Sequence, residues 1–284
     1  ANNLTLTASG ITTSSTVDAG NYNFTLVTDA LALGGAVNGG TGTLTIKPNT
    51  ASTTIGLGDS ASGALNLNNT ELGYINTASH NFASIIIGDA TNGTGAITYN
   101  TNGTTISYGS NLTLQQKSTG SGITLNNSIT TTGTQTYTGA VTLGGSITLD
   151  TAGGSNASNR AVSFSSTVDT NASAHQGLII TTTDGNIGFT GAIGSGANGA
   201  IGALSLTSTG TTTFSSTVAA ASLIQNASTG TTAINGASIT TTGDQTYKNA
   251  VTLGASTVTL TATGHNIAFT GSAATIDGAK ALVV

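Results

Sequence analysis

The chain has 284 residues, of which ten are acidic, five are basic and 40 are glycine, and its net charge is −5. It contains no Cys, which excludes a disulfide framework, a thiolate nucleophile and a sulfur-ligated metal site. The basic residues are scattered, whereas a nucleic-acid-binding surface needs them clustered; they are Lys47, Lys117, Arg160, Lys248 and Lys280.

Short strands are predicted along the whole chain. One template, in which a small polar residue separates two aliphatic residues, recurs from end to end. Successive side chains of a strand face opposite sides, so this template points two aliphatic side chains inward and one polar side chain outward. In chain order the triplets are Leu4–Leu6, Leu44–Ile46, Leu65–Leu67, Leu112–Leu114, Ile123–Leu125, Val141–Leu143, Ile147–Leu149, Leu204–Leu206 and Val258–Leu260.

The segments between these strands are short and rich in Gly, Asn, Ser and Asp, which favour turns and positive φ. Pro48 follows a predicted strand and is expected to end it. We find no run at helical spacing. No apolar run approaches the roughly 20 residues needed to cross a bilayer, so we expect no membrane span.

A long phrase occurs twice, which indicates stacked similar units. Residues 129–144 read ITTTGTQTYTGAVTLG and residues 239–254 read ITTTGDQTYKNAVTLG, and the likeness extends weakly to 149 and 260. Shorter phrases recur at other offsets: FSSTV at 164 and 214, and N-I-x-F-T-G at 186 and 266. Such repetition is typical of solenoids, whose repeats contact only their neighbours.

Two all-β architectures are compatible with many short alternating strands. An antiparallel sandwich would have aromatic-rich strands and domains of about 100 residues, whereas aromatic residues make up only 4% of this chain. We therefore predict a parallel β-helix over residues 1–284 as a single domain. At about 20 residues per coil, the chain would form about 14 coils. We expect it to be a segment of a longer chain or a filament subunit.

Two patterns resemble a known protein family. The first runs from Leu65–Ile75 through Phe82–Asp89 to Gly95–Tyr99, and the second is the phrase at 131–144 and 241–254. Both are similar to repeats of very large bacterial surface proteins of the filamentous haemagglutinin type. The resemblance implies a right-handed parallel β-helix. It also implies export by two-partner secretion or as an autotransporter passenger, and a role in adhesion, aggregation or biofilm. Their N-terminal secretion domain is not recognisable here, so the resemblance implies a shaft segment.

Few residues are candidates for catalysis. Glu71 is the single glutamate, and glycoside chemistry would need a second carboxylate such as Asp59 or Asp89. We expect Glu71 to lie on a surface turn. His80, His175 and His265 are isolated and lack metal-ligand spacing. We predict no catalytic, cofactor or metal site.

Other polar and aromatic residues have structural explanations. We expect the Asp residues next to Gly to form turns, because none repeats the nonapeptide of calcium-binding β-rolls; they are Asp59, Asp89, Asp184, Asp244 and Asp277. Gly191–Gly202 lacks the lysine of a phosphate loop. Of the tyrosines that could form a carbohydrate platform, we expect Tyr137 and Tyr247 to pack inside the repeat.

Ten Asn-x-Ser/Thr sequences occur, about as many as the composition gives by chance. Glycosylation there is a hypothesis that an intact-mass measurement would test; the asparagines are Asn3, Asn23, Asn68, Asn92, Asn102, Asn111, Asn126, Asn156, Asn171 and Asn226.

The sequence thus predicts a structural segment of an extracellular or cell-surface bacterial fibre, not an enzyme. We expect self-association, by end-to-end stacking or by continuation of the same chain, and host-cell or matrix glycans as further partners. An ice-binding Thr-rich solenoid and a carbohydrate-active β-helix enzyme are the alternatives.

Overall fold

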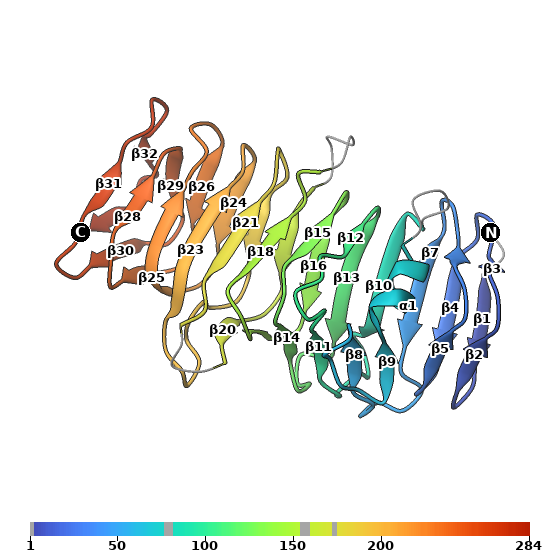
Figure 1. Cartoon of the computed structure of the whole chain (residues 1–284). Helices are drawn as coiled ribbons and strands as arrows, with labels where there is room; N and C mark the ends of the chain where they lie inside the picture. The colour runs from blue at the N-terminus through green and yellow to red at the C-terminus, as the bar shows by residue number, and fades with distance from the viewer. Residues whose placement is uncertain (1–2, 77–81, 154–159, 172–174) are drawn as a thin grey trace. The chain divides into compact units, whose positions relative to one another are not determined.

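The computed structural model describes residues 3–76, 82–153, 160–171 and 175–284. It divides into two compact units, Ala1–Ala140 and Val141–Val284, each described here by itself. Both consist almost entirely of short strands, and the strand pairs of their described residues are parallel, as between β1 and β4 or β22 and β24. Figure 1 shows these strands side by side within each unit. The parallel β-helix prediction is therefore confirmed, and the antiparallel sandwich is excluded.

Unit 1 has one long ladder of strands and several shorter ones. The long ladder, called its first sheet, runs in the order β1 (Leu4–Thr7), β4 (Phe24–Val27), β7 (Thr43–Lys47), β10 (Ser84–Asp89), β13 (Asn111–Gln116) and β16 (Gln135–Thr138). A second ladder runs in the order β14 (Ile123–Leu125), β11 (Ile97–Tyr99), β8 (Ile55–Leu57) and β9 (Leu65–Leu67). Three pairs complete the unit: β12 (Ser107–Tyr108) with β15 (Ile129–Thr131), β2 (Ile11–Thr13) with β5 (Leu31–Leu33), and β3 (Val17–Asp18) with β6 (Val37–Asn38).

Unit 2 is built in the same way. Its first sheet runs in the order β19 (Val162–Phe164), β22 (Ile187–Phe189), β24 (Thr211–Phe214), β26 (Thr231–Ile234), β29 (Ala250–Leu253) and β32 (Ile276–Asp277). Another ladder runs in the order β18 (Ile147–Asp150), β21 (Leu178–Thr181), β23 (Ile201–Thr207), β25 (Val218–Gln225), β27 (Ser238–Thr241), β30 (Thr257–Ala262) and β33 (Ala281–Val283). β28 (Gln245–Tyr247) pairs with β25 and with β31 (Ile267–Phe269), and β17 (Val141–Leu143) pairs with β20 (Val168–Thr170).

The coils vary in length. In unit 1 the register pairs Leu4 with Phe24 and Phe24 with Leu44, so these first two coils are equally long and match the length expected from the sequence. The next pairing, of Leu44 with Ile85, encloses a longer segment that includes β8, β9 and α1. In unit 2 the register pairs Phe164 with Phe189 and Phe189 with Phe214, so these coils are longer than the first two of unit 1. Many coils are longer than the expected length of about 20 residues. The described residues therefore contribute six first-sheet strands to each unit, fewer in total than the number of coils expected from the sequence.

The core of each unit is a column of aliphatic and aromatic side chains. Eight of the nine predicted triplets bury both outer residues and leave the middle one half-exposed, and Leu44, Ile46 and Leu67 are fully buried. The exception is β1, where Leu4 and Leu6 are 47% and 42% exposed, because this strand pairs on one side only. Like residues lie over like, which places apolar atoms in contact from coil to coil.

Turn residues behave as predicted at the positions that demand it. Gly40 and Gly194 have φ of 51° and 67°, the left-handed region that glycine enters without steric cost. β7 ends at Lys47, directly before Pro48, as expected of a residue that cannot donate to the ladder.

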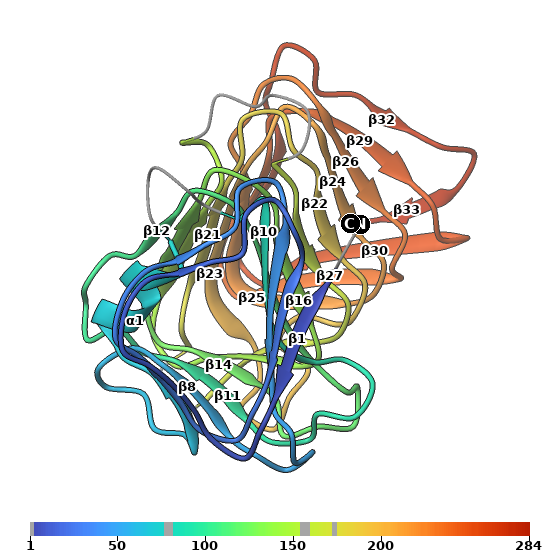
Figure 2. The same ribbon diagram turned by 90° about the vertical axis from the view of Figure 1, so that its right-hand side faces the viewer.

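One helix was not predicted. α1 (Asn69–Tyr74) is only six residues long, so its sequence shows no helical period. Asn68 caps it: its side chain accepts from the N–H of Glu71, and the Glu71 side chain accepts in turn from the N–H of Asn68. α1 lies against β5 and β9, at the left of Figure 2, and buries Leu72.

Candidate functional site

The outward side of the first sheet of unit 1 carries a row of hydroxyl groups, here called the threonine file. Its members lie on successive strands, directly across from one another in register, about 4.8 Å apart. In order they are Thr5, Thr25, Thr45, Ile86, Thr113 and Thr136. Ile86 is the one apolar member. The file therefore offers a neutral surface of hydroxyl donors and acceptors.

A second row beside the threonine file is engaged in holding the coils together. Asn23 Oδ1 accepts from the N–H of Thr43 at 2.9 Å, and its Nδ2 donates to Asn3 Oδ1 at 3.2 Å. Asn111 does the same, accepting from the N–H of Thr134 at 2.8 Å and donating to Ser84 Oγ at 3.1 Å. These amides cap the backbone of the following coil and leave less capacity for a ligand.

Asp29 organises the turn of the next coil. Its carboxylate accepts from the hydroxyls of Thr50 and Thr53, both at 2.6 Å, and from the N–H groups of Thr50 and Asn49 at 2.8 and 3.0 Å. The bonds from Thr50 and Thr53 lower the pKa of Asp29, because they stabilise the charged form. No pattern in the sequence indicates this cluster, since its members are 20 to 24 residues apart.

Asp89, a candidate partner of Glu71, serves a different turn. Burial raises the pKa of Asp89, but hydrogen bonds from the N–H groups of Thr91 and Asn92 and the charge of Lys47 outweigh it, so that the pKa is lowered. Lys47 Nζ lies 3.5 Å from Asp89 Oδ2. This is a turn-forming aspartate, as expected from the sequence.

The other aspartates also serve turns and corners. Asp59 and Asn69 bond reciprocally, each side chain accepting the other's backbone N–H, at 2.9 and 3.2 Å. Asp244 Oδ1 accepts from the N–H of Asn266 at 3.0 Å. Asp277 Oδ1 accepts from the N–H of Gly278 at 2.6 Å.

Glu71 does not lie on a surface turn, and that prediction was wrong. It is 9% exposed, at the third position of α1. Oε1 accepts from the N–H of Leu33 at 2.8 Å, and Oε2 accepts from the N–H of Asn68 at 2.9 Å. Its carboxylate thus joins α1 to β5 and is engaged by two backbone donors, a structural role.

The histidines are separate from one another. His80 lies outside the described residues. His175 has φ of 46° and its Nδ1 lies 2.6 Å from the carbonyl oxygen of Ala200. It lines a groove of about 320 Å³ together with Ser146, Gly177 and Ile179. His265 Nδ1 lies 3.6 Å from Asp244 Oδ1, and both side chains are more than half exposed. Among the described residues, no three His, Asp or Glu side chains are grouped as a metal would require.

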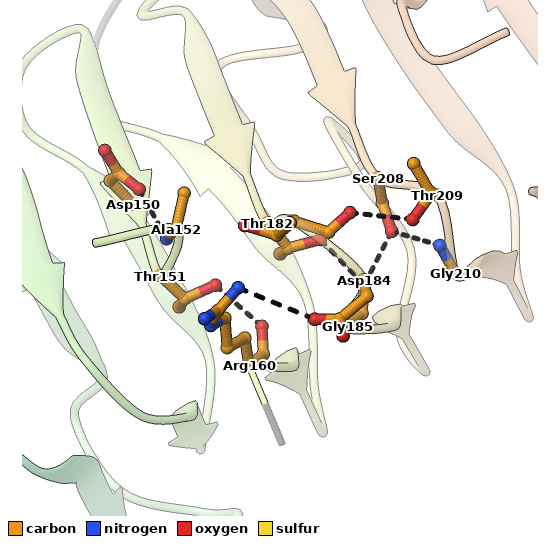
Figure 3. Close-up of polar contacts among 11 residues, drawn as sticks. Asp150, Thr151, Ala152, Arg160, Thr182, Asp184, Gly185, Ser208, Thr209 and Gly210 are labelled. Atoms are coloured by element: carbon orange, nitrogen blue, oxygen red, sulfur yellow. Dashed lines mark hydrogen bonds and ion pairs between the residues drawn. The ribbon is translucent and has the colours of Figure 1, made fainter. Parts of the chain in front are cut away.

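Arg160 is the most buried cation in the described part of unit 2, and Figure 3 shows its ion pair with Asp184. Its Nη1 lies 3.8 Å from Asp184 Oδ1, and its carbonyl oxygen accepts from the hydroxyl of Thr151 at 2.6 Å. In the neighbouring coils, the buried hydroxyls of Thr182 and Ser208 both donate to the carbonyl oxygen of Gly185, at 2.7 and 2.6 Å. These inward hydroxyls donate to backbone carbonyl oxygens at the corners of the coils, so that the buried polar groups are hydrogen-bonded.

The long repeat encodes the same buried network twice. In the first copy, Tyr137 Oη donates to Gln135 Oε1 at 2.9 Å, and Gln135 Nε2 donates to the carbonyl oxygen of Ile129 at 3.1 Å. In the second copy, Tyr247 Oη donates to Gln245 Oε1 at 3.0 Å, and Gln245 Nε2 donates to Ile239 O at 3.2 Å. The sequence Gln-Thr-Tyr indicates this network, because strand alternation places Gln on the same inward side as Tyr.

The tyrosines provide no aromatic platform at four positions. Tyr99, Tyr108, Tyr137 and Tyr247 are buried, which confirms the packing role predicted for the last two. Burial raises the pKa of Tyr99 to about 12 and raises the pKa of the other three buried phenols as well. Tyr22 is 51% exposed.

Several of the Asn-x-Ser/Thr asparagines already have structural bonds. Asn68 caps α1, and Asn226 Nδ2 donates to Ser205 Oγ at 3.0 Å. Asn156 lies outside the described residues. Glycosylation stays a hypothesis.

No helix in the described residues is long and apolar enough to span a membrane. No protein-family model matches the chain, and neither a curated protein nor a solved structure matches it.

Proposed function

We propose that this chain is a structural segment of a secreted or cell-surface bacterial fibre, and that its work is adhesion, aggregation or matrix formation. The observation that carries the proposal is the layering of like residues. Thr5 lies across from Thr25, and Phe164 lies across from Phe189, as in units that extend by adding coils. The role follows from a repeated surface, for which no reacting side chain is needed.

The repeated surface suits neutral, multivalent partners. The threonine file of unit 1 presents hydroxyls, and Lys47 forms an ion pair with Asp89 within the protein. Hydroxyl and amide groups bond well to the hydroxyls of a glycan, and repetition adds avidity without strong individual contacts. Host-cell or matrix glycans are therefore the proposed external partners.

Glycan binding is tested with beads that carry the purified chain. We expect binding to glycan-bearing cells or matrix that persists at high salt, because neutral contacts are not screened. Replacing the central threonines Thr45 and Thr113 by Ala should weaken binding, whereas Thr240→Ala and Thr261→Ala, on exposed threonines of unit 2, serve as the matched control. Binding that vanishes at moderate salt would contradict the neutral-surface interpretation.

The open side of β1 supports self-association. Leu4 and Leu6 are exposed there although they continue the inward phase of the strands that follow. Unpaired strand edges are templates for a further strand. We propose that this side takes a second copy of the chain or a continuation of the same chain, which would bury both leucines.

Sedimentation velocity tests the stacking of copies. We expect species that grow with concentration, and we expect Leu6→Lys to abolish them because the joint would bury an unpaired charge. Thr5→Lys is the matched control, with the same charge on the outward side of the same strand. A monomer at all concentrations would refute stacking.

A second candidate function is favoured by the threonine file itself. Ice-binding solenoids display threonine in rows, and unit 1 has such a row apart from Ile86. In unit 2 the outward row of the first sheet is irregular, with Ser163, Gly188, Thr213 and Ala233. A thermal-hysteresis assay decides, and activity in it would displace the adhesive role. For the carbohydrate-active enzyme alternative, we expect a screen against acidic glycans to show no turnover.

A further inference from the structure

Three polar side chains, here called the polar row, are joined by hydrogen bonds in the core of unit 2. Gln225, Thr232 and Asn249 are fully buried. Gln225 Nε2 lies 3.0 Å from Thr232 Oγ1, and Thr232 Oγ1 lies 2.8 Å from Asn249 Oδ1. These residues come from β25, from β26 and from the segment that follows β28, so the polar row links successive coils.

The amide atoms at the two ends of the polar row are unsatisfied. Gln225 Oε1 and Asn249 Nδ2 have no hydrogen-bond partner among the described residues. Flipping both amides exchanges donor and acceptor along both hydrogen bonds, and the result is the same in kind. If Asn249 donates to Thr232 and Thr232 donates to Gln225, then Gln225 Nε2 and Asn249 Oδ1 are left over. Either direction leaves one donor at one end and one acceptor at the other.

A third unsatisfied group, the hydroxyl of Thr212, lies beside the polar row. Thr212 is the register partner of Thr232 on the adjacent strand β24, and it is also fully buried. Its hydroxyl has no hydrogen-bond partner among the described residues. A hydroxyl donates or accepts, so it complements whichever direction the amides take.

We propose that the core of unit 2 binds one internal water molecule at Gln225, Asn249 and Thr212. The water donates to the free amide oxygen, accepts from the free amide N–H and makes its third bond to the Thr212 hydroxyl. Buried waters typically make about three such bonds to otherwise unsatisfied groups. A cation would need acceptors at both ends and an anion would need donors at both, so neither matches a site that has one of each.

The same unit provides a matched comparison. Gln245 is also fully buried, but its Nε2 donates to the carbonyl oxygens of Ile239 and Thr261 at 3.2 and 2.9 Å, and its Oε1 accepts from Tyr247. Both the amide oxygen and the amide nitrogen of Gln245 therefore already have partners inside the protein. The first copy of the repeat has Gly139 where the second has Asn249, so the proposed site is specific to the second copy.

Nuclear magnetic resonance of the intact chain tests the site without any substitution. We expect the side-chain amides of Gln225 and Asn249 to show cross-relaxation with a long-lived water, and the amide of Gln245 to show none. A high-resolution crystal structure should place one density peak within hydrogen-bond distance of Gln225, Asn249 and Thr212. The absence of both signals, or equal water contact at Gln245, would overturn the proposal.

A substitution provides an independent readout. Thr212→Val removes the third partner of the water while nearly keeping the side-chain shape, and we expect the cross-relaxation at Gln225 and Asn249 to be lost as the water exchanges faster. Thr213→Val, on the outward side of the same strand, should leave it unchanged. An unaltered signal in the Thr212→Val protein would remove Thr212 from the site and refute the three-ligand geometry.

Discussion

Glu71 and Leu33 are joined by a hydrogen bond of 2.8 Å from the Leu33 N–H to Glu71 Oε1, across 38 residues of chain. The other carboxylate oxygen accepts from the N–H of Asn68, which starts α1. One buried side chain therefore fixes both the start of the helix and its attachment to β5.

Removing this carboxylate should destabilise unit 1. Glu71→Ala leaves the buried N–H of Leu33 unpaired, at about 1–3 kcal/mol, and removes the bond to the N–H of the exposed Asn68, worth about 0.5–1.5 kcal/mol. We therefore expect a loss of roughly 1.5–4.5 kcal/mol in the free energy of unfolding. Glu71→Gln should cost less, because one amide oxygen can still accept. Thr70→Ala, at an exposed position of the same helix, is the control. Urea unfolding followed by circular dichroism measures all three, and equal stabilities would contradict the role of Glu71.

The phenylalanine column of unit 2 should be sensitive at its centre. Phe189 stacks on Phe164 and Phe214, with ring centroids 5.1 and 5.5 Å apart. Phe189→Ala should cost about 3–5 kcal/mol through lost burial and a cavity. Phe269, which stacks on Tyr247 but is half-exposed, should cost clearly less when replaced by Ala. Urea midpoints test the ranking, and the reverse order would show that the column does not stabilise the unit.

Alkaline pH should unfold the protein through its buried phenols. Burial raises the pKa of Tyr99 to about 12 and also raises the pKa of Tyr108, Tyr137 and Tyr247. A raised folded-state pKa means that the stability is fully present below the unfolded value of about 10 and is lost as pH rises through the folded value. We expect phenolate absorbance of the native protein to lag behind that of the urea-unfolded protein. Coincident titrations would show that these tyrosines are accessible.

The Asp29 carboxylate should lose its stabilising effect at low pH, whereas the buried tyrosines lose theirs at high pH. The pKa of Asp29 is lowered by the Thr50 and Thr53 hydroxyls, so its stabilising effect is present above the unfolded pKa and lost as pH falls through the folded value. Thr50→Val and Thr53→Val should each raise the pKa of Asp29 towards 3.8, as measured by carboxyl chemical shifts. Thr41→Val, at an exposed position of the same coil, should leave it unchanged.

Removal of one whole coil should be tolerated. Deleting residues 188–212 joins Ile187 to Thr213 and brings Phe164 into register with Phe214, because the two successive pairings have the same offset along the chain. The deleted coil also contains Ile193, whose bridges to Val168 and Val218 would be replaced by a direct pairing of those two. We expect a folded β protein. Deletion of residues 188–199, about half a coil, should unfold unit 2, and the reverse pattern would refute the coil assignment.

Much of the fold could be predicted from alternation alone. The triplets from Leu44–Ile46 onward bury their outer residues, since period-two alternation depends only on strand geometry. The inward Thr182 could not be predicted, because a polar residue is expected to face outward unless the turn carbonyl that satisfies it is known. α1 was missed because a helix of one and a half turns has no period to detect, and its capping box was its only signal. The Asp29 cluster was missed because its partners are one coil away.

Three corner asparagines give the chain a direction of growth. Asn23 caps Thr43, Asn111 caps Thr134 and Asn186 caps Thr211, and each time the acceptor belongs to the earlier coil and the donor to the later one. A finished coil thus holds ready the acceptor that the next one requires. A polypeptide that emerges amino end first could add coils in the order in which they appear, without waiting for its remainder.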